Sequence, residues 1–213
     1  RDYYASRGLG DVYKRQIHDW YSWKHKKGPS MIVLTGASAS GKTEVVKLLK
    51  IKYGIDKVVT HTTREIRSLE IPDEDYHFIT KKEFQKMISE NKFVEWTIYN
   101  GNYYGTSKEE IGINKAIILE PNGVKAMQAL NQDTIIVFRL LASEITRFNR
   151  MIIRQDPLEK IRERISNDKI CFSDDNFTNV DYTIDTDTHT ILEVTDEVYS
   201  LYNKKLSQLN HKA

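Results

Sequence analysis

The pattern of hydrophobic and polar residues alternates between buried strands and helices along most of the chain. Short apolar or β-branched runs, which are typical of buried strands, are followed by stretches with apolar residues at helical spacing. The predicted strands are Met31–Thr35, Lys57–Thr60, Ala116–Glu120, Thr134–Leu141 and Val180–Ile184. The predicted helices are Lys42–Tyr53, one that begins at Pro121, Ser143–Asp168 with an interruption at Pro157, and Ile191–Leu209. Strands that alternate with helices predict an α/β fold, in which a mostly parallel sheet is covered on both faces.

Residues 61–106 break this alternation with short strands, loops and a single helix. The spacing of Thr80 and Glu83 predicts a capping box that opens this helix. Asn100-Gly101 is a strong hairpin signal between two strands. We therefore interpret residues 61–106 as an inserted subdomain. The core is expected from residues 31–60, 107–142 and 178–210. The remaining predicted elements of the insertion are the helix Lys81–Glu90 and the strands Phe93–Tyr99 and Asn102–Gly105. A further helix, capped by Ser107 with Glu110, is predicted directly after it.

Composition and charge narrow the class of protein. The 213 residues carry a formal net charge of +2, but residues 1–30 hold seven basic and three acidic side chains, so the remainder is slightly acidic. The basic isoelectric point therefore gives no argument for nucleic-acid binding by the folded part. No apolar run has the length of a membrane span. The single cysteine, Cys171, excludes an internal disulfide and suits a reducing compartment. We expect a cytoplasmic protein with neither nucleic-acid nor membrane partners.

The first 30 residues show no clear hydrophobic period, and we expect a non-native or disordered leader there. The run D-V-Y-K-R-Q at Asp11–Gln16 resembles the translation of a transposon-end sequencing adaptor. We interpret residues 1–16 as a sequencing artefact and assign no chemistry to residues 1–30.

A phosphate-binding loop follows the first predicted strand. Gly36 is separated by four residues from Gly41, and Lys42 and Thr43 come directly after it. Glycines let the backbone curl so that successive N–H groups face phosphate oxygens, and the following helix adds its dipole. The lysine contacts the outer phosphates and the Thr43 hydroxyl is the predicted ligand of Mg²⁺. The residues predicted to bind ATP are Gly36, Ala37, Ser38, Ala39, Ser40, Gly41, Lys42 and Thr43.

Four short motifs in the insertion indicate a second site. They are T-H-T-T-R-E-I-R at Thr60–Arg67, D-Y-H-F at Asp75–Phe78, F-V-E-W at Phe93–Trp96, and N-Y-Y-G-T at Asn102–Thr106. With the phosphate loop, this ordered set resembles the guanylate kinase family over residues 31–210. The resemblance implies a three-layer P-loop kinase fold with an inserted nucleotide-monophosphate-binding subdomain and a helical lid at about residues 143–170. It also implies Mg²⁺-dependent phosphorylation of GMP or dGMP by ATP, through in-line transfer.

The resemblance also implies roles for individual residues. Arg64 and Arg67 match the arginines that grip the phosphate of GMP, and Tyr76 and Tyr104 match tyrosines that complete this cradle. Glu95 matches the acid that accepts hydrogen bonds from N1–H and the 2-amino group of guanine. Adenine lacks these donors, so a site built this way rejects it. The complete implied set for GMP is Thr60, Arg64, Arg67, Glu70, Tyr76, Glu95, Tyr104, Thr106 and Glu120.

Arginines recur in the predicted lid. By similarity to the family, Arg150, Arg154 and Arg164 are expected to act with Lys42 as catalytic positive charges over the transferred phosphoryl group. A basic, solvated helix face is the alternative interpretation of this pattern.

The chain departs from the family at two places. Ala37 and Ala39 replace the usual proline and glycine of the loop, and we expect phosphate binding to persist. Ile118 and Glu120 replace two aspartates that help to order Mg²⁺ and the acceptor nucleotide. Two alternatives therefore remain: a related kinase with another phosphorylated acceptor, and a non-catalytic guanylate kinase-like module that binds proteins.

Overall fold

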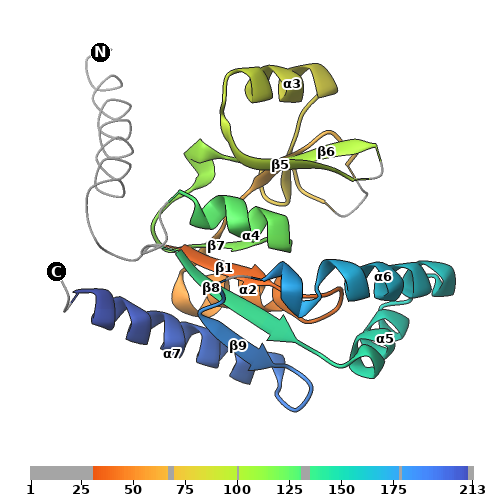
Figure 1. The fold of residues 1–213 in the computed structure, drawn as a ribbon, viewed down its shortest axis with the longest axis vertical. Coiled ribbons are helices and arrows are strands. Elements are labelled where there is room, and N and C mark those ends of the chain that lie inside the picture. Colours follow the sequence, from red (N-terminus) through yellow and green to blue (C-terminus); the bar gives the residue numbers. More distant parts are fainter. Residues whose placement is uncertain (1–30, 67–69, 100, 131–134, 178, 211–213) are drawn as a thin grey trace, which may run out of the picture.

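The computed structural model describes residues 31–66, 70–99, 101–130, 135–177 and 179–210, and it forms two sheets (Figure 1). Arg67, a predicted site residue, lies outside the described residues, as do the leader and Asn100. The larger sheet has the strand order β2-β7-β1-β8-β9, and every neighbouring pair is parallel. The predicted parallel sheet is thus confirmed. Its strands are β1 (Met31–Thr35), β2 (Asp56–Lys57), β7 (Lys115–Ile118), β8 (Ile135–Leu141) and β9 (Tyr182–Asp185).

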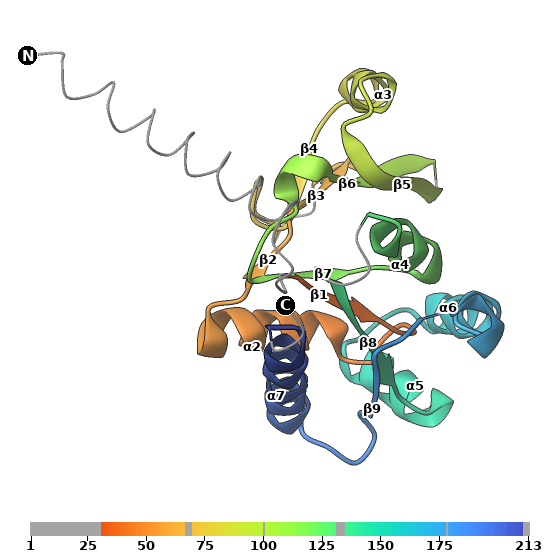
Figure 2. The same ribbon diagram turned by 60° about the vertical axis from the view of Figure 1, so that its left-hand side comes forward.

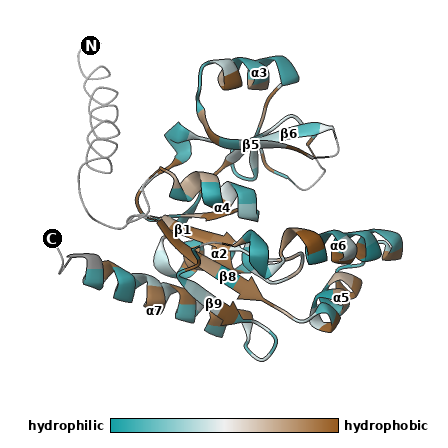
Figure 3. Cartoon of the chain, in the orientation of Figure 1, coloured by the Kyte–Doolittle hydropathy of each residue, from teal (hydrophilic) through white to brown (hydrophobic). Residues whose placement is uncertain are grey.

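Helices cover both faces of this sheet, so the core has three layers (Figure 2). Strand β1 is buried over its whole length, and its side chains point alternately to the two faces. Ile32 and Leu34 pack in the cluster that includes residues of α2 (Lys42–Tyr53) and α7 (Ile191–Asn210). Met31 and Val33 pack in the cluster that includes α4 (Pro121–Gln128). The central strands are accordingly mainly hydrophobic, as the colours of Figure 3 show.

The smaller sheet has the order β4-β3-β6-β5 and carries one helix, α3 (Lys81–Ser89). Thr80 and Glu83 form the predicted capping box at its start. On the sheet side, Phe84 is fully buried and its ring stacks on Phe93 with centroids 4.3 Å apart. The strands are β3 (Thr60–Thr62), β4 (Tyr76–Phe78), β5 (Phe93–Tyr99) and β6 (Asn102–Ser107).

Two further helices, α5 (Glu144–Ile153) and α6 (Leu158–Cys171), lie beside the carboxyl ends of β1 and β8 (Figure 1). The Ser143 side chain caps α5 by accepting from the Thr146 amide. Pro157 separates the two helices, as predicted. Met151, Ile161 and Ile165 form a small core of their own. No helix in the described ranges is both long and apolar enough to cross a membrane.

Several predicted elements are wrong in detail. The single strand Lys57–Thr60 is two strands, β2 and β3, which belong to different sheets. Ser107 makes no capping hydrogen bond, and only a 3₁₀ turn, η1 (Lys108–Glu110), follows it. The last strand is β9 rather than Val180–Ile184. For the strands, hydrogen-bond partners far away in the sequence set the boundary, and local patterns do not contain them.

Candidate active site

The phosphate loop joins β1 to α2, and two of its glycines have backbones that other residues rarely adopt. Gly36 has φ +145°, and a Cβ there would lie 2.3 Å from the carbonyl oxygen of Leu140. Gly41 has φ +99° and directly precedes α2. The loop can therefore turn tightly over β8 and present the amino end of α2 to an anion.

Lys42 folds back over the loop. Its Nζ donates to the carbonyl oxygens of Gly36, at 2.6 Å, and Ala37, at 2.7 Å. Burial lowers the pKa of Lys42 to about 8, although the nearby carboxylate of Asp168 opposes this effect. A partly desolvated ammonium beside backbone N–H groups is a strong binding partner for an anion. Thr43 follows at the first turn of α2 and is exposed.

The loop is supported from the side of α5. Arg150 donates to the Ala39 carbonyl at 3.2 Å and to the Thr186 carbonyl at 2.6 Å. The Thr186 hydroxyl in turn donates to the carbonyl of Ser40 at 3.2 Å. Arg150 therefore lies against the back of the loop, as a support.

The alanine at position 39 of the loop has a packing reason. Ala39 has φ +59°, in the left-handed region, where a side chain costs about 1–2 kcal/mol. Its methyl group packs against the small core of Met151, Ile161 and Ile165. This contact ties the loop to α5 and α6 and offsets part of the backbone strain.

The two other predicted catalytic arginines lie on a shared carboxylate. Arg154 and Arg164 both form ion pairs with Asp156, the latter at 2.8 Å. Their side chains are 54% and 40% exposed, and neither lines the cavity described below. The structure therefore places them near one another but does not bring them to the loop.

An acid that the sequence did not single out does reach the loop. Asp168 of α6 accepts from the Ser38 amide at 2.9 Å and from the Ser38 hydroxyl at 3.2 Å. It also accepts from Arg147 of α5 at 2.6 Å, and both charged side chains are less than 10% exposed. This buried pair holds α5, α6 and the loop together.

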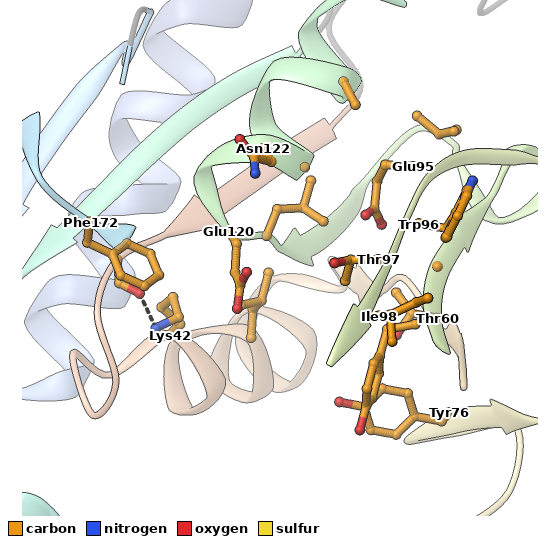
Figure 4. Close-up of a pocket in the computed structure, with 18 of the residues that line it drawn as sticks. Lys42, Thr60, Tyr76, Glu95, Trp96, Thr97, Ile98, Glu120, Asn122 and Phe172 are labelled. Carbon is orange, nitrogen blue, oxygen red and sulfur yellow. Dashed lines mark hydrogen bonds between the residues drawn. The ribbon is translucent and has the colours of Figure 1, made fainter. Parts of the chain in front are cut away.

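A cavity of about 820 Å³ extends from the phosphate loop to the smaller sheet. In Figure 4, Phe172 and Lys42 lie at one side of the view, Glu95 and Trp96 at the other, and Glu120 lies between them. Its volume is that of a site for nucleotide-sized ligands. The lining residues are Gly36, Ser38, Lys42, Thr60, Tyr76, Val94, Glu95, Trp96, Thr97, Ile98, Tyr104, Gly105, Ile118, Leu119, Glu120, Asn122, Gly123, Ala126, Asp168 and Phe172.

Glu95 points into this cavity from β5. It pairs across the hairpin with Thr106 of β6, and the Thr106 hydroxyl donates to Glu95 Oε1 at 2.5 Å. Burial raises the pKa of Glu95, and the negative charge of Glu120 raises it further, whereas the hydrogen bonds from Thr106 oppose the shift. One carboxylate oxygen is thus fixed by Thr106, which orients the group toward a ligand with N–H donors.

Several residues predicted for the phosphate cradle of the acceptor lie around Arg64. Arg64 donates to Glu70 at 2.6 Å, and both side chains are less than 20% exposed. This hydrogen bond raises the pKa of Arg64. The guanidinium lies 5.6 Å from the ring centroid of Tyr76, and the Tyr76 and Tyr104 rings meet edge to face at 6.2 Å. Thr60, Tyr76 and Tyr104 line the cavity, whereas Arg64 and Glu70 are not among its lining residues.

Sequence reasoning missed the parts of the wall that carry no motif. Asn122 and Phe172 line the cavity, and the Lys42 ammonium lies 5.9 Å from the Phe172 ring centroid. Asn122 lies two residues after Glu120, a predicted site residue, so its place near this acid was available as a signal. Asp168 and Phe172 lie at the end of a helix far from the loop in the sequence, and no motif marked them.

Comparison with known proteins shows which family the chain resembles. The family model for guanylate kinase matches residues 28–198. A guanylate kinase from Schizosaccharomyces pombe is 43% identical over 116 residues, and the match covers 50% of this chain and 57% of that protein. A guanylate kinase from Psychrobacter arcticus is 34% identical over 145 residues, covering 64% of this chain and 70% of that protein.

Among solved structures, a guanylate kinase from Anaplasma phagocytophilum superimposes with a TM-score of 0.62. The match covers 86% of this chain and 89% of that chain at 20% sequence identity, so it shows the shared fold.

Proposed function

The chain belongs to the guanylate kinase family, and we propose that it transfers the γ-phosphoryl group of ATP to GMP or dGMP. The products are ADP and GDP or dGDP. One observation carries the proposal: a single cavity joins Lys42 of the phosphate loop to Glu95 of β5. The phosphates of ATP at the Lys42 end and the purine of GMP at the Glu95 end would place the two substrates in line.

The donor end binds the phosphates of ATP. The loop N–H groups and the amino end of α2 attract the phosphate oxygens, and the Lys42 ammonium bridges the outer two. Arg150 keeps the loop in this conformation through the carbonyl of Ala39. Phe172 covers the lysine and limits its hydration.

The acceptor end recognises guanine. The free oxygen of Glu95 accepts from the base, and Thr106 holds the other oxygen. Because the carboxylate is already partly desolvated, it gains most from a ligand that offers two adjacent N–H groups. Guanine offers N1–H and the 2-amino group, whereas adenine presents a lone pair at N1.

Arg64 and Arg67 bind the phosphate of the acceptor, with hydroxyls from Tyr76 and Tyr104. Glu70 holds the Arg64 guanidinium at 2.6 Å, which fixes its planar fork before the phosphate arrives. A pre-positioned fork loses little conformational entropy on binding.

Transfer then proceeds in line from ATP to the acceptor phosphate without a covalent intermediate. Lys42 neutralises charge on the migrating group, and closure of α5 and α6 brings Arg154 and Arg164 toward it and excludes water. We infer that α5 and α6 form the lid and that residues 61–106 form the acceptor-binding subdomain.

The donor set also fits Mg²⁺. The Thr43 hydroxyl and the Glu120 carboxylate are hard oxygen ligands, the type that Mg²⁺ prefers. They are the residues of this chain that would hold the ion, which neutralises phosphate charge when bound. Ile118 supplies no ligand, so one carboxylate contributes where the family has two.

An acceptor panel tests the proposal. The full chain, with ATP and Mg²⁺, is assayed for ADP formation with GMP, dGMP, IMP and AMP. We expect turnover of GMP and dGMP, weaker turnover of IMP and very little of AMP. Equal turnover of AMP and GMP would refute the role of Glu95. Turnover only with other phosphorylated acceptors would favour a related kinase, and failure to bind ATP would favour a protein-binding module.

A further inference from the structure

Asp168 places a carboxylate directly on the phosphate loop. Its two oxygens accept from the amide and the hydroxyl of Ser38, at 2.9 and 3.2 Å. The same side chain receives the Arg147 guanidinium at 2.6 Å and is 8% exposed. It also lines the cavity on the side of Lys42. The contacts therefore come from both parts of the structure that the donor nucleotide would touch, the loop and α5.

A carboxylate and a phosphate use the same partners. Both are anions that accept charge-assisted hydrogen bonds from backbone N–H groups and guanidinium groups. A phosphate oxygen that approached the Ser38 amide would meet the negative charge of Asp168 at hydrogen-bonding distance. Two anions so close in a partly buried site repel each other strongly, so they do not share this position.

We infer that Asp168 is a positioning residue that acts as an internal counter-ion of the donor site. It holds Arg147 against the loop and gives way to the phosphate of the nucleotide. This inference rests on the donor half of the proposed function and adds an acid to it. When the nucleotide binds, its phosphate replaces the carboxylate on Ser38, and Arg147 passes from Asp168 to the phosphate.

The exchange has a functional consequence. Competition from Asp168 makes the loop bind phosphates more weakly than its N–H groups and cations alone would. The same competition helps to expel ADP, because the carboxylate returns to Ser38 as the product leaves. Asp168 therefore lowers the affinity of the loop for phosphate and speeds the release of ADP.

Neutralisation of Asp168 tests this inference. Binding of tripolyphosphate and of Mg-ADP to the full chain is measured by titration calorimetry for the wild type, Asp168→Asn and Glu163→Gln. Glu163 is exposed on the same helix, so its substitution removes one negative charge away from the loop. We expect Asp168→Asn to bind tripolyphosphate about tenfold more tightly or more, and Glu163→Gln to stay within about twofold of wild type.

Kinetics provide a second readout. Asp168→Asn is expected to lower the KM for ATP and also to lower kcat, because ADP leaves more slowly. Unchanged or weaker tripolyphosphate binding by a folded Asp168→Asn variant would overturn the inference and leave the proposed kinase activity intact. A wild-type chain that binds neither tripolyphosphate nor Mg-ADP would overturn the donor site and the inference together.

A double variant guards against misfolding, because Asp168→Asn alone leaves Arg147 buried without its counter-ion. Arg147→Gln with Asp168→Asn removes both charges. If the carboxylate competes with phosphate, its loss offsets the loss of the guanidinium, and tripolyphosphate affinity stays within about threefold of wild type. A loss of about tenfold or more would show that Asp168 opposes no phosphate and would refute the inference.

Discussion

Substitution of Glu95 by glutamine tests how the cavity recognises its base. The change keeps the shape of the side chain and replaces one carboxylate oxygen by an amide NH₂ group. Because the Thr106 hydroxyl donates to Oε1 at 2.5 Å, the glutamine is expected to keep its oxygen on Thr106. Its NH₂ group then faces the base, where the proposed function places the N1–H and 2-amino donors of guanine.

The expected loss follows from the hydrogen bonds involved. Each hydrogen bond to a charged group contributes about 1.5–3 kcal/mol, so loss of two removes about 3 kcal/mol or more. This corresponds to a decrease of about 100-fold or more in kcat/KM for GMP. AMP presents an acceptor at N1, to which the new NH₂ group can donate, so its turnover should not fall and is expected to rise.

The measurement is a coupled assay of ADP formation with GMP, IMP and AMP. IMP keeps N1–H but has no 2-amino group, so its loss should be smaller than that of GMP. Glu74→Gln, at an exposed acid of the same subdomain, is the control for removal of charge alone. If Glu95→Gln preferred GMP over AMP as strongly as the wild type does, Glu95 would not read the base.

The same variant should show a cost that Glu95 imposes on the fold. Burial raises the pKa of the Glu95 carboxyl group in the folded protein above its pKa in the unfolded chain. The contribution of this group to stability is therefore complete below the unfolded-state pKa and is lost as the pH rises through the folded-state pKa. Glu95→Gln should therefore raise the melting temperature at pH 7, and the gain should shrink toward pH 4. A uniform effect at both pH values would contradict this reasoning.

Three further predictions follow from the loop and the phosphate cradle. Burial lowers the pKa of Lys42 to about 8, so tripolyphosphate binding by the wild type should weaken as the pH rises from 7 to 9. Lys42→Met should lack this pH dependence, and a wild-type affinity that does not change with pH would refute the prediction. Gly36→Ala should destabilise the chain by about 3 kcal/mol or more in thermal unfolding, since its Cβ would lie 2.3 Å from the Leu140 carbonyl; a wild-type melting temperature would contradict this. Arg64→Lys should raise the KM for GMP about tenfold or more and change kcat less. An ammonium group, unlike a planar guanidinium, cannot pair with Glu70 and bind a phosphate at the same time. An unchanged KM would exclude Arg64 from the cradle.

Local patterns predicted the parts of the fold that depend on nearby residues. The continuous burial of β1, the glycine-bounded loop and the capping box before α3 are all set within a few residues, and the structure contains each of them. Glu95 and Thr106 were named from separate motifs, and the hairpin register brings them together. Hairpin pairing is almost a local property, because the turn fixes which residues face each other.

Contacts between distant segments were beyond this reasoning. The division of one extended stretch into β2 and β3 depends on which sheet each half joins. Similarity to the family gave Arg150, Arg154 and Arg164 one shared role and did not single out Arg147, but the structure separates all four. Arg147 pairs with Asp168, Arg150 supports the loop, and the other two lie on Asp156.

The sequence by itself determined that this chain has a phosphate loop and a parallel sheet, and its short motifs, through their resemblance to a family, led to the proposed guanine site. These features follow from hydrophobic period, glycine spacing and short motifs, which are properties of the chain read in order. Only the tertiary structure decided which charges meet. Ser38 and Asp168 are 130 residues apart, and they touch because α6 packs on the loop through Ala39 and its apolar neighbours. Burial then decides what each charge does, since it lowers the pKa of Lys42 and raises that of Glu95 in one cavity.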